Sequence, residues 1–245
     1  MENKIKGIEE ILLMGPGPSL THPRVYSALS RPTLGHLDPY FIQIMDDIKA
    51  MLQKVFQTNN SLTIPMSGTG SAGMETFFVN LIEKGDPVLV LINGAFGKRM
   101  LDIAQRLGAD ADSMDFKWGT PVTTDEVEAQ LMKKKYKIVA MVHAETSTGV
   151  CNPAEEVGKL VNEHGAFYIL DTVTSLGGME VAVDKWHVDA IYSGTQKCLS
   201  CPPGLSPVSF SDRAVDSIMN RATKVPNWYL DVSMIANYWA GKKRA

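Results

Sequence analysis

The sequence lacks the features that would direct a protein to a membrane, a secretory route or a nucleic acid. Its 245 residues include only three cysteines, which cannot build a disulfide framework and favour a reducing compartment. No apolar run approaches the roughly 20 residues of a membrane span, and the N-terminus carries scattered charges in place of a signal-peptide core. The formal net charge of -3 gives no reason to expect a nucleic acid or an anionic membrane as a partner. We therefore expect a cytoplasmic protein that binds neither.

Internal repeats, low-complexity tracts and long linkers are also absent, and apolar runs of strand length alternate with amphipathic stretches. Strands are predicted at 87–92, 138–142 and 166–170, with weaker candidates at 190–192 and 207–210. Helices are predicted at 40–56, 71–83, 101–107, 125–132 and 154–164. Strands that alternate with helices imply an α/β fold, with a mainly parallel sheet and helices on both faces. Residues 1–39 lack this periodicity, which predicts an extended N-terminal arm before a domain at 40–245.

A glycine-rich turn precedes the helix predicted at 71–83. Gly68, Gly70 and Gly73 match the dinucleotide fingerprint G-x-G-x-x-G, but the next predicted strand is not followed by the carboxylate that would hold a ribose. A cup for one phosphate monoester explains the turn better, because glycines let the backbone approach an anion and a helix N-terminus points free N–H groups at it. Thr69 and Ser71 add hydroxyl donors. A turn that binds no ligand is an alternative that this loop alone leaves open.

Two reactive side chains follow other predicted strands: Asp171 after 166–170 and Lys197 after 190–192. The carboxyl ends of parallel strands share one edge of a sheet. A desolvated lysine amine forms Schiff bases with carbonyls, and pyridoxal 5′-phosphate (PLP) requires such a lysine, together with an acidic partner for its ring nitrogen. Taken alone, the aspartate could cap a helix and the lysine could be a surface side chain. Together with a phosphate cup, the pair predicts a PLP site.

These residues lie within motifs that resemble the class V PLP-dependent aminotransferases, closest to the alanine–glyoxylate and serine–pyruvate (serine–glyoxylate) aminotransferase group. The motifs keep the order of the family and cover nearly the whole chain. They are Gly15-Pro16-Gly17-Pro18-Ser19, Ser67-Gly68-Thr69-Gly70, Asn93-Gly94-Ala95-Phe96-Gly97, His143-Ala144-Glu145-Thr146-Ser147-Thr148-Gly149, Asp171-Thr172-Val173 and Ser193-Gly194-Thr195-Gln196-Lys197. The resemblance implies the large domain of the PLP-dependent transferase fold type I.

The resemblance also implies a role for each residue of the site. Lys197 would carry PLP as a Schiff base and move a proton at the substrate Cα, and Asp171 would pair with the pyridinium nitrogen. Thr146 would hydrogen-bond near the ring oxygen, Val173 would pack on one ring face and Phe96 would stack on the other. The phosphate would be held by Thr69, Gly70 and Gln196. The cup inferred from the residues adds Gly68 and Ser71, although the family often has histidine at the position of Ser71.

The reaction implied is the transfer of an amino group from a small amino acid, alanine or serine, to a 2-oxo acid such as glyoxylate or pyruvate. A homodimer with its site at the subunit interface is expected. The resemblance covers the arm and large domain and stops before the small C-terminal domain, which usually supplies an arginine for the substrate carboxylate. A truncated, non-catalytic PLP-binding remnant is therefore an alternative, as are the family's 2-aminoethylphosphonate transaminase and cysteine desulfurase reactions.

The remaining polar motifs predict no further site. Cys198-x-x-Cys201 resembles half of a zinc or redox motif, but no second cysteine pair or suitably spaced histidine accompanies it, so no metal is expected. His143 ends a predicted strand and His164 lies near a helix end, and both are interpreted as structural.

Overall fold

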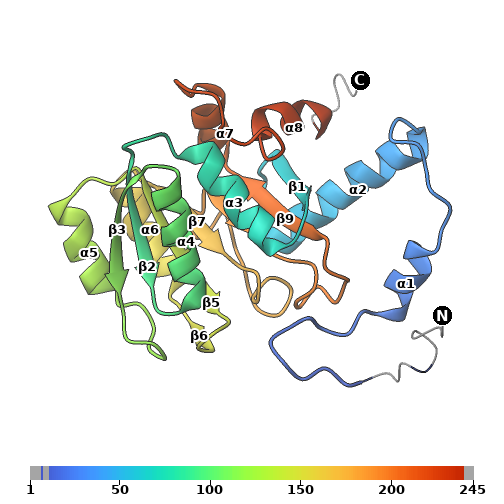
Figure 1. Ribbon diagram of the computed structural model, residues 1–245, viewed down its shortest axis with the longest axis horizontal. Coiled ribbons are helices and arrows are strands. Elements are labelled where there is room, and N and C mark those ends of the chain that lie inside the picture. Colours follow the sequence, from blue (N-terminus) through green and yellow to red (C-terminus); the bar gives the residue numbers. More distant parts are fainter. Residues whose placement is uncertain (1–6, 8–10, 240–245) are drawn as a thin grey trace, which may run out of the picture.

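A seven-stranded sheet forms the centre of the computed structural model, which describes residues 7 and 11–239 (Figure 1). The strands of this sheet and of a small two-stranded ribbon are β1 (Leu62–Ser67), β2 (Pro87–Ile92), β3 (Asp110–Asp115), β4 (Ile138–Val142), β5 (Ala144–Glu145), β6 (Val150–Cys151), β7 (Phe167–Asp171), β8 (Ala190–Tyr192) and β9 (Leu205–Phe210). The order in the main sheet is β1-β9-β8-β7-β4-β2-β3, and β5 pairs with β6 in the ribbon. Strand β9 is antiparallel to β1 and β8, and the other neighbouring pairs are parallel. The predicted mainly parallel α/β sheet is confirmed.

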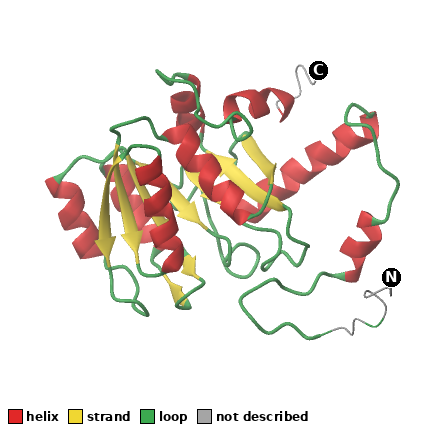
Figure 2. Cartoon of the chain, in the orientation of Figure 1, coloured by secondary structure: helices red, strands yellow, loops and turns green. Residues whose placement is uncertain are grey.

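Eight helices accompany the strands in the described part of the chain, and none of them is long and apolar enough to cross a membrane (Figure 2). They are α1 (Pro23–Leu29), α2 (Pro39–Phe56), α3 (Gly70–Leu81), α4 (Ala95–Arg106), α5 (Thr124–Lys133), α6 (Ala154–Glu163), α7 (Asp212–Met219) and α8 (Val232–Trp239). Helices α3, α4, α7 and α8 pack on one face of the sheet, and the end of α2 packs with α5 and α6 on the other. Both faces are therefore covered, as predicted.

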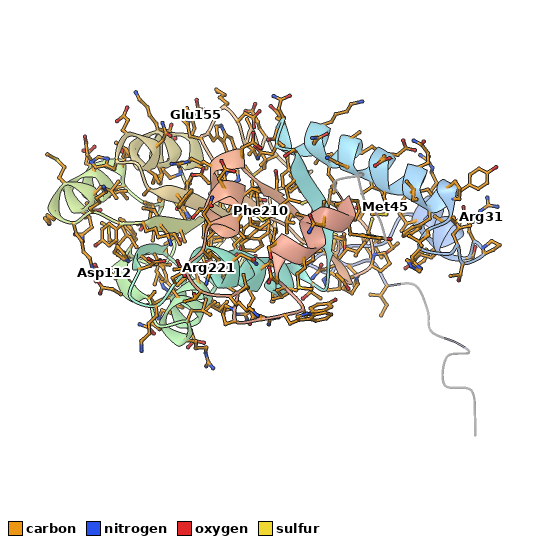
Figure 3. The ribbon with its side chains drawn as sticks, turned by 90° about the horizontal axis from the view of Figure 1, so that it is seen from above. Arg31, Met45, Asp112, Glu155, Phe210 and Arg221 are labelled. Carbon is orange, nitrogen blue, oxygen red and sulfur yellow. The ribbon has the colours of Figure 1, made fainter. Side chains whose placement is uncertain are left out.

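The central strands contribute to two hydrophobic cores, one on each face of the sheet. In β2, Val88, Val90 and Ile92 pack in the core beneath α3 and α4, whereas Leu89 and Leu91 pack in the core beneath α5 and α6. Successive side chains of a strand point to opposite faces, so a strand covered on both faces is apolar at every position. In Figure 3, Phe210 of β9 lies near the middle of the molecule; its ring centroid is 4.3 Å from that of Phe77 in α3.

Two strands of the main sheet were missed by the sequence analysis, and both lie at its edges. Strand β1 contains Pro65, which has no N–H for a ladder and is tolerated on an edge strand. Strand β3 carries three aspartates and is largely exposed, so its place depends on backbone pairing with β2 and not on an apolar pattern.

The N-terminal arm is not extended throughout. Residues 23–29 form α1, which buries no side chain and is defined by local capping: Pro23 occupies its first turn, and the His22 ring accepts a hydrogen bond from the backbone N–H of Arg24 at 3.1 Å. Before this helix the arm lies against the body of the molecule. The N–H of Ser19 donates to the carbonyl of Gln196 at 2.8 Å. The arm is thereby fixed beside the loop that follows β8.

Replacement of Gly158 in α6 tests the packing of that helix against the chain that precedes β8. A Cβ atom at Gly158 would overlap the carbonyl oxygen of Trp186. We expect Gly158→Ala to lower the free energy of unfolding by about 1–3 kcal/mol, against the gain of roughly 1 kcal/mol that alanine brings to an unobstructed helix. Gly35→Ala, which adds a methyl group in open space, is the control. Urea titration measures both; an unchanged or raised stability of Gly158→Ala would contradict the close packing.

Candidate functional site

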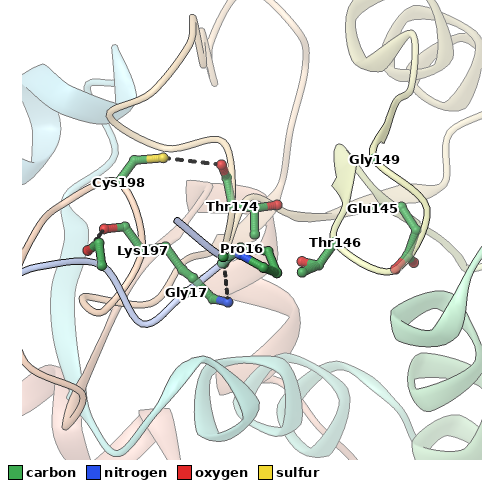
Figure 4. Close-up of a pocket in the computed structure, with 10 residues that line it drawn as sticks. Pro16, Gly17, Glu145, Thr146, Gly149, Thr174, Lys197 and Cys198 are labelled. Carbon is green, nitrogen blue, oxygen red and sulfur yellow. Dashed lines mark hydrogen bonds between the residues drawn. The ribbon is translucent and has the colours of Figure 1, made fainter. Parts of the chain in front are cut away.

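The loops that follow the parallel strands gather at one edge of the sheet, because β2, β4, β7 and β8 run in the same direction. A cavity of about 300 Å³ opens there between these loops and the N-terminal arm (Figure 4). It is lined by Gly15, Pro16, Gly17, Ser19, Glu145, Thr146, Gly149, Thr174, Lys197 and Cys198. Its volume is at the lower end of the range typical of small-molecule sites.

Lys197 lies in this cavity, in the loop after β8, and the arm covers its side chain. The ammonium group donates to the carbonyl oxygen of Pro16 at 2.6 Å, and the Ser19 hydroxyl donates to the carbonyl of Lys197 at 2.6 Å. Gly17 has a φ of 123°, and a Cβ there would lie 2.5 Å from Cδ and 2.6 Å from Nζ of the lysine. Only glycine allows both this backbone conformation and this close approach.

Asp171 ends β7 and is 2% exposed. One carboxylate oxygen accepts from the Tyr192 hydroxyl at 2.7 Å, and the other accepts from the backbone N–H of Val173 at 2.7 Å. Burial raises the pKa of this carboxyl group to about 6, the two hydrogen bonds oppose the rise, the charge of Glu145 adds to it, and the charge of Lys197 opposes it. The lysine and the aspartate therefore act on each other across the same edge of the sheet.

The glycine turn after β1 lies beside the loop that carries Lys197. Gly68 has a φ of 122°, and its N–H donates to the carbonyl of Gly204 at 2.8 Å. Thr69 is the N-cap residue of α3, but its side chain makes no capping hydrogen bond. The first amides of a helix have no partners within the helix. The N-terminus of α3 is therefore not capped by its own N-cap side chain.

Three of the predicted site segments contact one another at this turn. A Cβ atom at Gly70 would lie 2.9 Å from a methyl carbon of Val173. A Cβ at Gly194 would lie 3.6 Å from Cα of Gly70 and 3.0 Å from Oε1 of Gln196. This Oε1 atom is buried and has no hydrogen-bond partner among the described residues. The structure thus brings the turn, the segment after Asp171 and the segment before Lys197 together.

Phe96 and Thr146 are placed differently. Thr146 lines the cavity with Lys197. Phe96 lies in the first turn of α4 and is half-buried; the guanidinium carbon of Arg99 lies 4.5 Å from its ring centroid, a cation–π contact. Its ring is not part of the cavity wall.

Three residues that the structure places at or beside the cavity were not predicted from the sequence. Glu145 is 1% exposed and lines it, Pro16 accepts the hydrogen bond of the lysine, and Tyr192 holds the aspartate. All three occur in or next to the motifs that carried the family resemblance. Their position in those motifs was the only signal from which they could have been predicted. Each contact joins segments distant in the chain.

The other polar residues considered from sequence are the histidines and the cysteines, of which Cys198 lines the cavity. His143 is buried, a ring nitrogen lies 3.0 Å from the Ser175 hydroxyl, and burial lowers its pKa to about 4. The three cysteines are free. Within the described ranges, no group of three or more histidine, cysteine, aspartate or glutamate side chains is arranged to hold a metal ion.

Comparison with known proteins gives the chain's relatives. A family model described as Aminotransferase class-V matches residues 20–231. Alanine–glyoxylate aminotransferase of Rattus norvegicus is 41% identical over 244 residues, 99% of this chain and 59% of the relative. (S)-ureidoglycine–glyoxylate transaminase of Bacillus subtilis is 38% identical over 249 residues, 94% of this chain and 60% of the relative. The crystal structure of alanine–glyoxylate aminotransferase from Nostoc sp. has a TM-score of 0.93 and 45% identity, over 100% of this chain and 66% of that one. The chain thus spans about 60% of the length of these curated relatives.

The raised pKa of Asp171 predicts how stability depends on pH in protein freed of bound small molecules. The folded pKa of about 6 lies above the ordinary value of 3.8, so the group favours folding below pH 3.8 and this contribution is lost as the pH rises through 6. Asp171→Asn removes the cost, and we expect it to be more stable than the native chain by up to about 3 kcal/mol at pH 8.

Urea titration of both proteins at pH 8 and pH 4 measures this difference, which should nearly vanish at the lower pH. The depressed pKa of His143 acts in the opposite direction as the pH falls, but it is common to both proteins and cancels. An Asp171→Asn variant that is the less stable protein at pH 8 would contradict the prediction.

Proposed function

Because the chain belongs to the class V aminotransferase family, we propose that it binds PLP through Lys197 and transfers amino groups between small amino and oxo acids. The observation that carries the proposal is the convergence of Lys197, Asp171 and the glycine turn from three strands at one edge of the sheet. A lysine, an acid and an anion cup are the groups that PLP requires.

The residues present fit the phosphate of PLP. The glycine turn brings backbone N–H groups and the positive end of α3 to one place, and an anion is stabilised there. Gly70 and Gly194 let their backbones approach Val173 and the Gln196 side chain more closely than a Cβ would allow, and the NH₂ group of Gln196 would donate to the anion. Thr69 and Ser71 would contribute hydroxyl groups to the same anion.

The ring side of the site has matching groups. Asp171 would hold a proton on the ring nitrogen, Val173 would pack against one face of the ring, and Thr146 would donate near the ring oxygen. When bound, PLP supplies an electron sink that stabilises negative charge at the Cα atom of an amino acid. Phe96 would cover the second face with its ring.

Lys197 would hold the cofactor through its ε-amine and, once displaced by the amino group of a substrate, move the proton at the substrate Cα. The arm supports this role, since Pro16 and Gly17 contact the side chain and hold its amine in one position. A neutral lysine amine close to the reacting carbon is the proton carrier that such a reaction needs.

Alanine or serine is the amino donor that we propose, and glyoxylate or pyruvate the acceptor. Two observations support small substrates: the cavity of about 300 Å³ is walled by the backbone of Gly15, Pro16 and Gly17, and the relatives named above act on glyoxylate. We propose the cytoplasm as the compartment, in agreement with three free cysteines.

Covalent trapping tests the assignment of Lys197. The chain is incubated with PLP, reduced with borohydride, digested and analysed by mass spectrometry. We expect the adduct on Lys197, and at least about a hundredfold loss of PLP affinity in Lys197→Ala, because the covalent bond is lost. Lys159→Ala, an exposed lysine on α6, is the control and should bind normally. An adduct that persists in Lys197→Ala at another lysine would refute the assignment.

The same preparation distinguishes the reactions open to this family. L-alanine or L-serine should discharge the visible absorption of the bound cofactor, and glyoxylate or pyruvate should restore it. Bound PLP with no response to any amino acid would identify a binding protein without turnover. A response to 2-aminoethylphosphonate or L-cysteine alone would replace the proposed substrates.

We also propose a homodimer, and the exposed apolar side chains of the N-terminal helices support it. Tyr26 and Leu29 of α1 are 58% and 66% exposed, and Tyr40, Ile44 and Met51 of α2 are 77%, 44% and 56% exposed. Both helices project beyond the sheet (Figure 1). Apolar surface gathered in this way marks an interface between proteins.

Light scattering at micromolar concentration should therefore give the mass of two chains. Ile44→Glu should shift the protein toward one chain, because a charge would be buried in the interface. Met132→Glu is the matched control, since Met132 on α5 is 77% exposed but lies far from α1 and α2 (Figure 1). A native chain that is monomeric throughout would exclude the dimer.

A further inference from the structure

One buried carboxylate at the cavity has no part in the function proposed above. Glu145 ends β5, is 1% exposed, and lines the cavity together with Thr146 and Lys197 (Figure 4). A carboxylate in such a place costs free energy unless its oxygens accept hydrogen bonds. The donors that surround it therefore indicate what it does.

The carboxylate of Glu145 joins two segments of backbone. Oε2 accepts from the N–H groups of Phe96 at 3.1 Å and Gly97 at 3.3 Å, and Oε1 accepts from the N–H of Ser147 at 3.1 Å and from its hydroxyl at 2.7 Å. The Ser147 hydroxyl in turn accepts from the N–H of Ala95 at 2.9 Å. One side chain thereby satisfies the first turn of α4 and fixes the turn that follows β5.

The chain leaves a space for this carboxylate. Gly94, the N-cap residue of α4, has a φ of -177°, an extended conformation that any residue adopts. A Cβ there would overlap Cγ and Cδ of Glu145. The glycine is thus required by the volume of the glutamate and not by its own backbone.

The arrangement exceeds what a helix cap needs. Helix α7 is capped by the single hydroxyl of Ser211, and α2 by one oxygen of Asp38. Glu145 uses both oxygens: Oε2 accepts from α4, and Oε1 accepts from the 145–149 turn and, at 3.4 Å, from the Phe96 N–H. Only a carboxylate offers two equivalent acceptors in this way. Its charge also acts on Asp171 across the cavity.

We propose, on the basis of the PLP site above, that Glu145 is a positioning residue that sets Phe96 and Thr146 relative to each other around the cofactor ring. Phe96 is held by its own N–H, and Thr146 is held between two residues of the bonded turn. Without the hydrogen bonds of Glu145, the Phe96 ring and the Thr146 hydroxyl would lie on separate segments that shift independently. Glu145 would act through these two residues, because its carboxylate is already bonded to Phe96, Gly97 and Ser147.

Glu145→Gln tests the proposal, because glutamine keeps one acceptor oxygen and turns an NH₂ group toward the second set of donors. PLP affinity of the full chain is measured by absorption, and the orientation of the bound ring by its induced circular dichroism per mole of cofactor. We expect an affinity lower by about tenfold or more and a reduced dichroic band. Ser147→Ala is a milder change and should also lower the PLP affinity and the dichroic band. It keeps the test decisive if Glu145→Gln does not fold.

Asp189→Asn is the matched control. Asp189 is also buried, at 3% exposure, and accepts from the backbone N–H of Tyr168 at 2.9 Å, but it precedes β8 at the opposite edge of the sheet. It should lower the melting temperature and leave PLP affinity and dichroism unchanged. Native affinity and dichroism in both Glu145→Gln and Ser147→Ala would overturn the positioning role while the PLP site stands. A native chain that binds no PLP would overturn both.

Discussion

The site depends on the unsatisfied N–H groups at the starts of two helices. Parallel strands deliver both α3 and α4 to the same edge of the sheet with their N-termini inward, and each brings amides that need an acceptor. The N–H groups of the two helices differ in where their acceptors come from. At α4 a buried carboxylate of the chain itself supplies the acceptors. At α3 the N-cap side chain makes no capping hydrogen bond, and in the function proposed above an anion from outside the chain would be the acceptor.

The different acceptors at the starts of α3 and α4 explain the distribution of charge around the cavity. The acid beside α4 and the acid at the end of β7 raise the electrostatic cost of a third negative group between them, whereas the cup at α3 favours one. A ligand with a cationic ring and an anionic tail therefore has one favoured orientation. The buried aspartate disfavours the folded chain at neutral pH by itself, and a ring cation beside it would offset that cost.

Sequence reasoning found the parts of the fold and site that depend on local pattern. Strands covered on both faces are continuous apolar runs, so 87–92 and 138–142 were predicted with the bounds observed. The convergence of Lys197 and Asp171 followed because both come after such strands. Helix α4 begins six residues before the predicted start at 101, because its first turn is capped from 49 residues away by Glu145. The contact between Lys197 and Pro16 spans 181 residues and has no local signal at all.

The edge strands were missed for a related reason. Hydrogen bonds to the backbone of β2 hold β3 in place, and backbone groups are the same in every residue. Strand β1 does point Leu62, Ile64 and Met66 into the core, but Pro65 interrupts its short apolar pattern. Helix α1 was missed because it buries nothing, and its two local signals, a histidine cap and a proline, are brief. The cofactor contacts assigned from the family resemblance remain predictions.

The hold of the arm on the loop after β8 has a consequence for reactivity. The backbone N–H groups of Ser19 and His22 donate to the carbonyls of Gln196 and Ser200, on either side of Lys197. These hydrogen bonds hold the arm and the loop together. Departure of the arm would release the loop and remove the hydrogen-bond partner of the Lys197 amine in a single event. Residues 15–22 thus hold the Lys197 side chain and its loop in place from the far end of the chain, and cleavage of the backbone there would disturb the position of this amine before it disturbed the sheet.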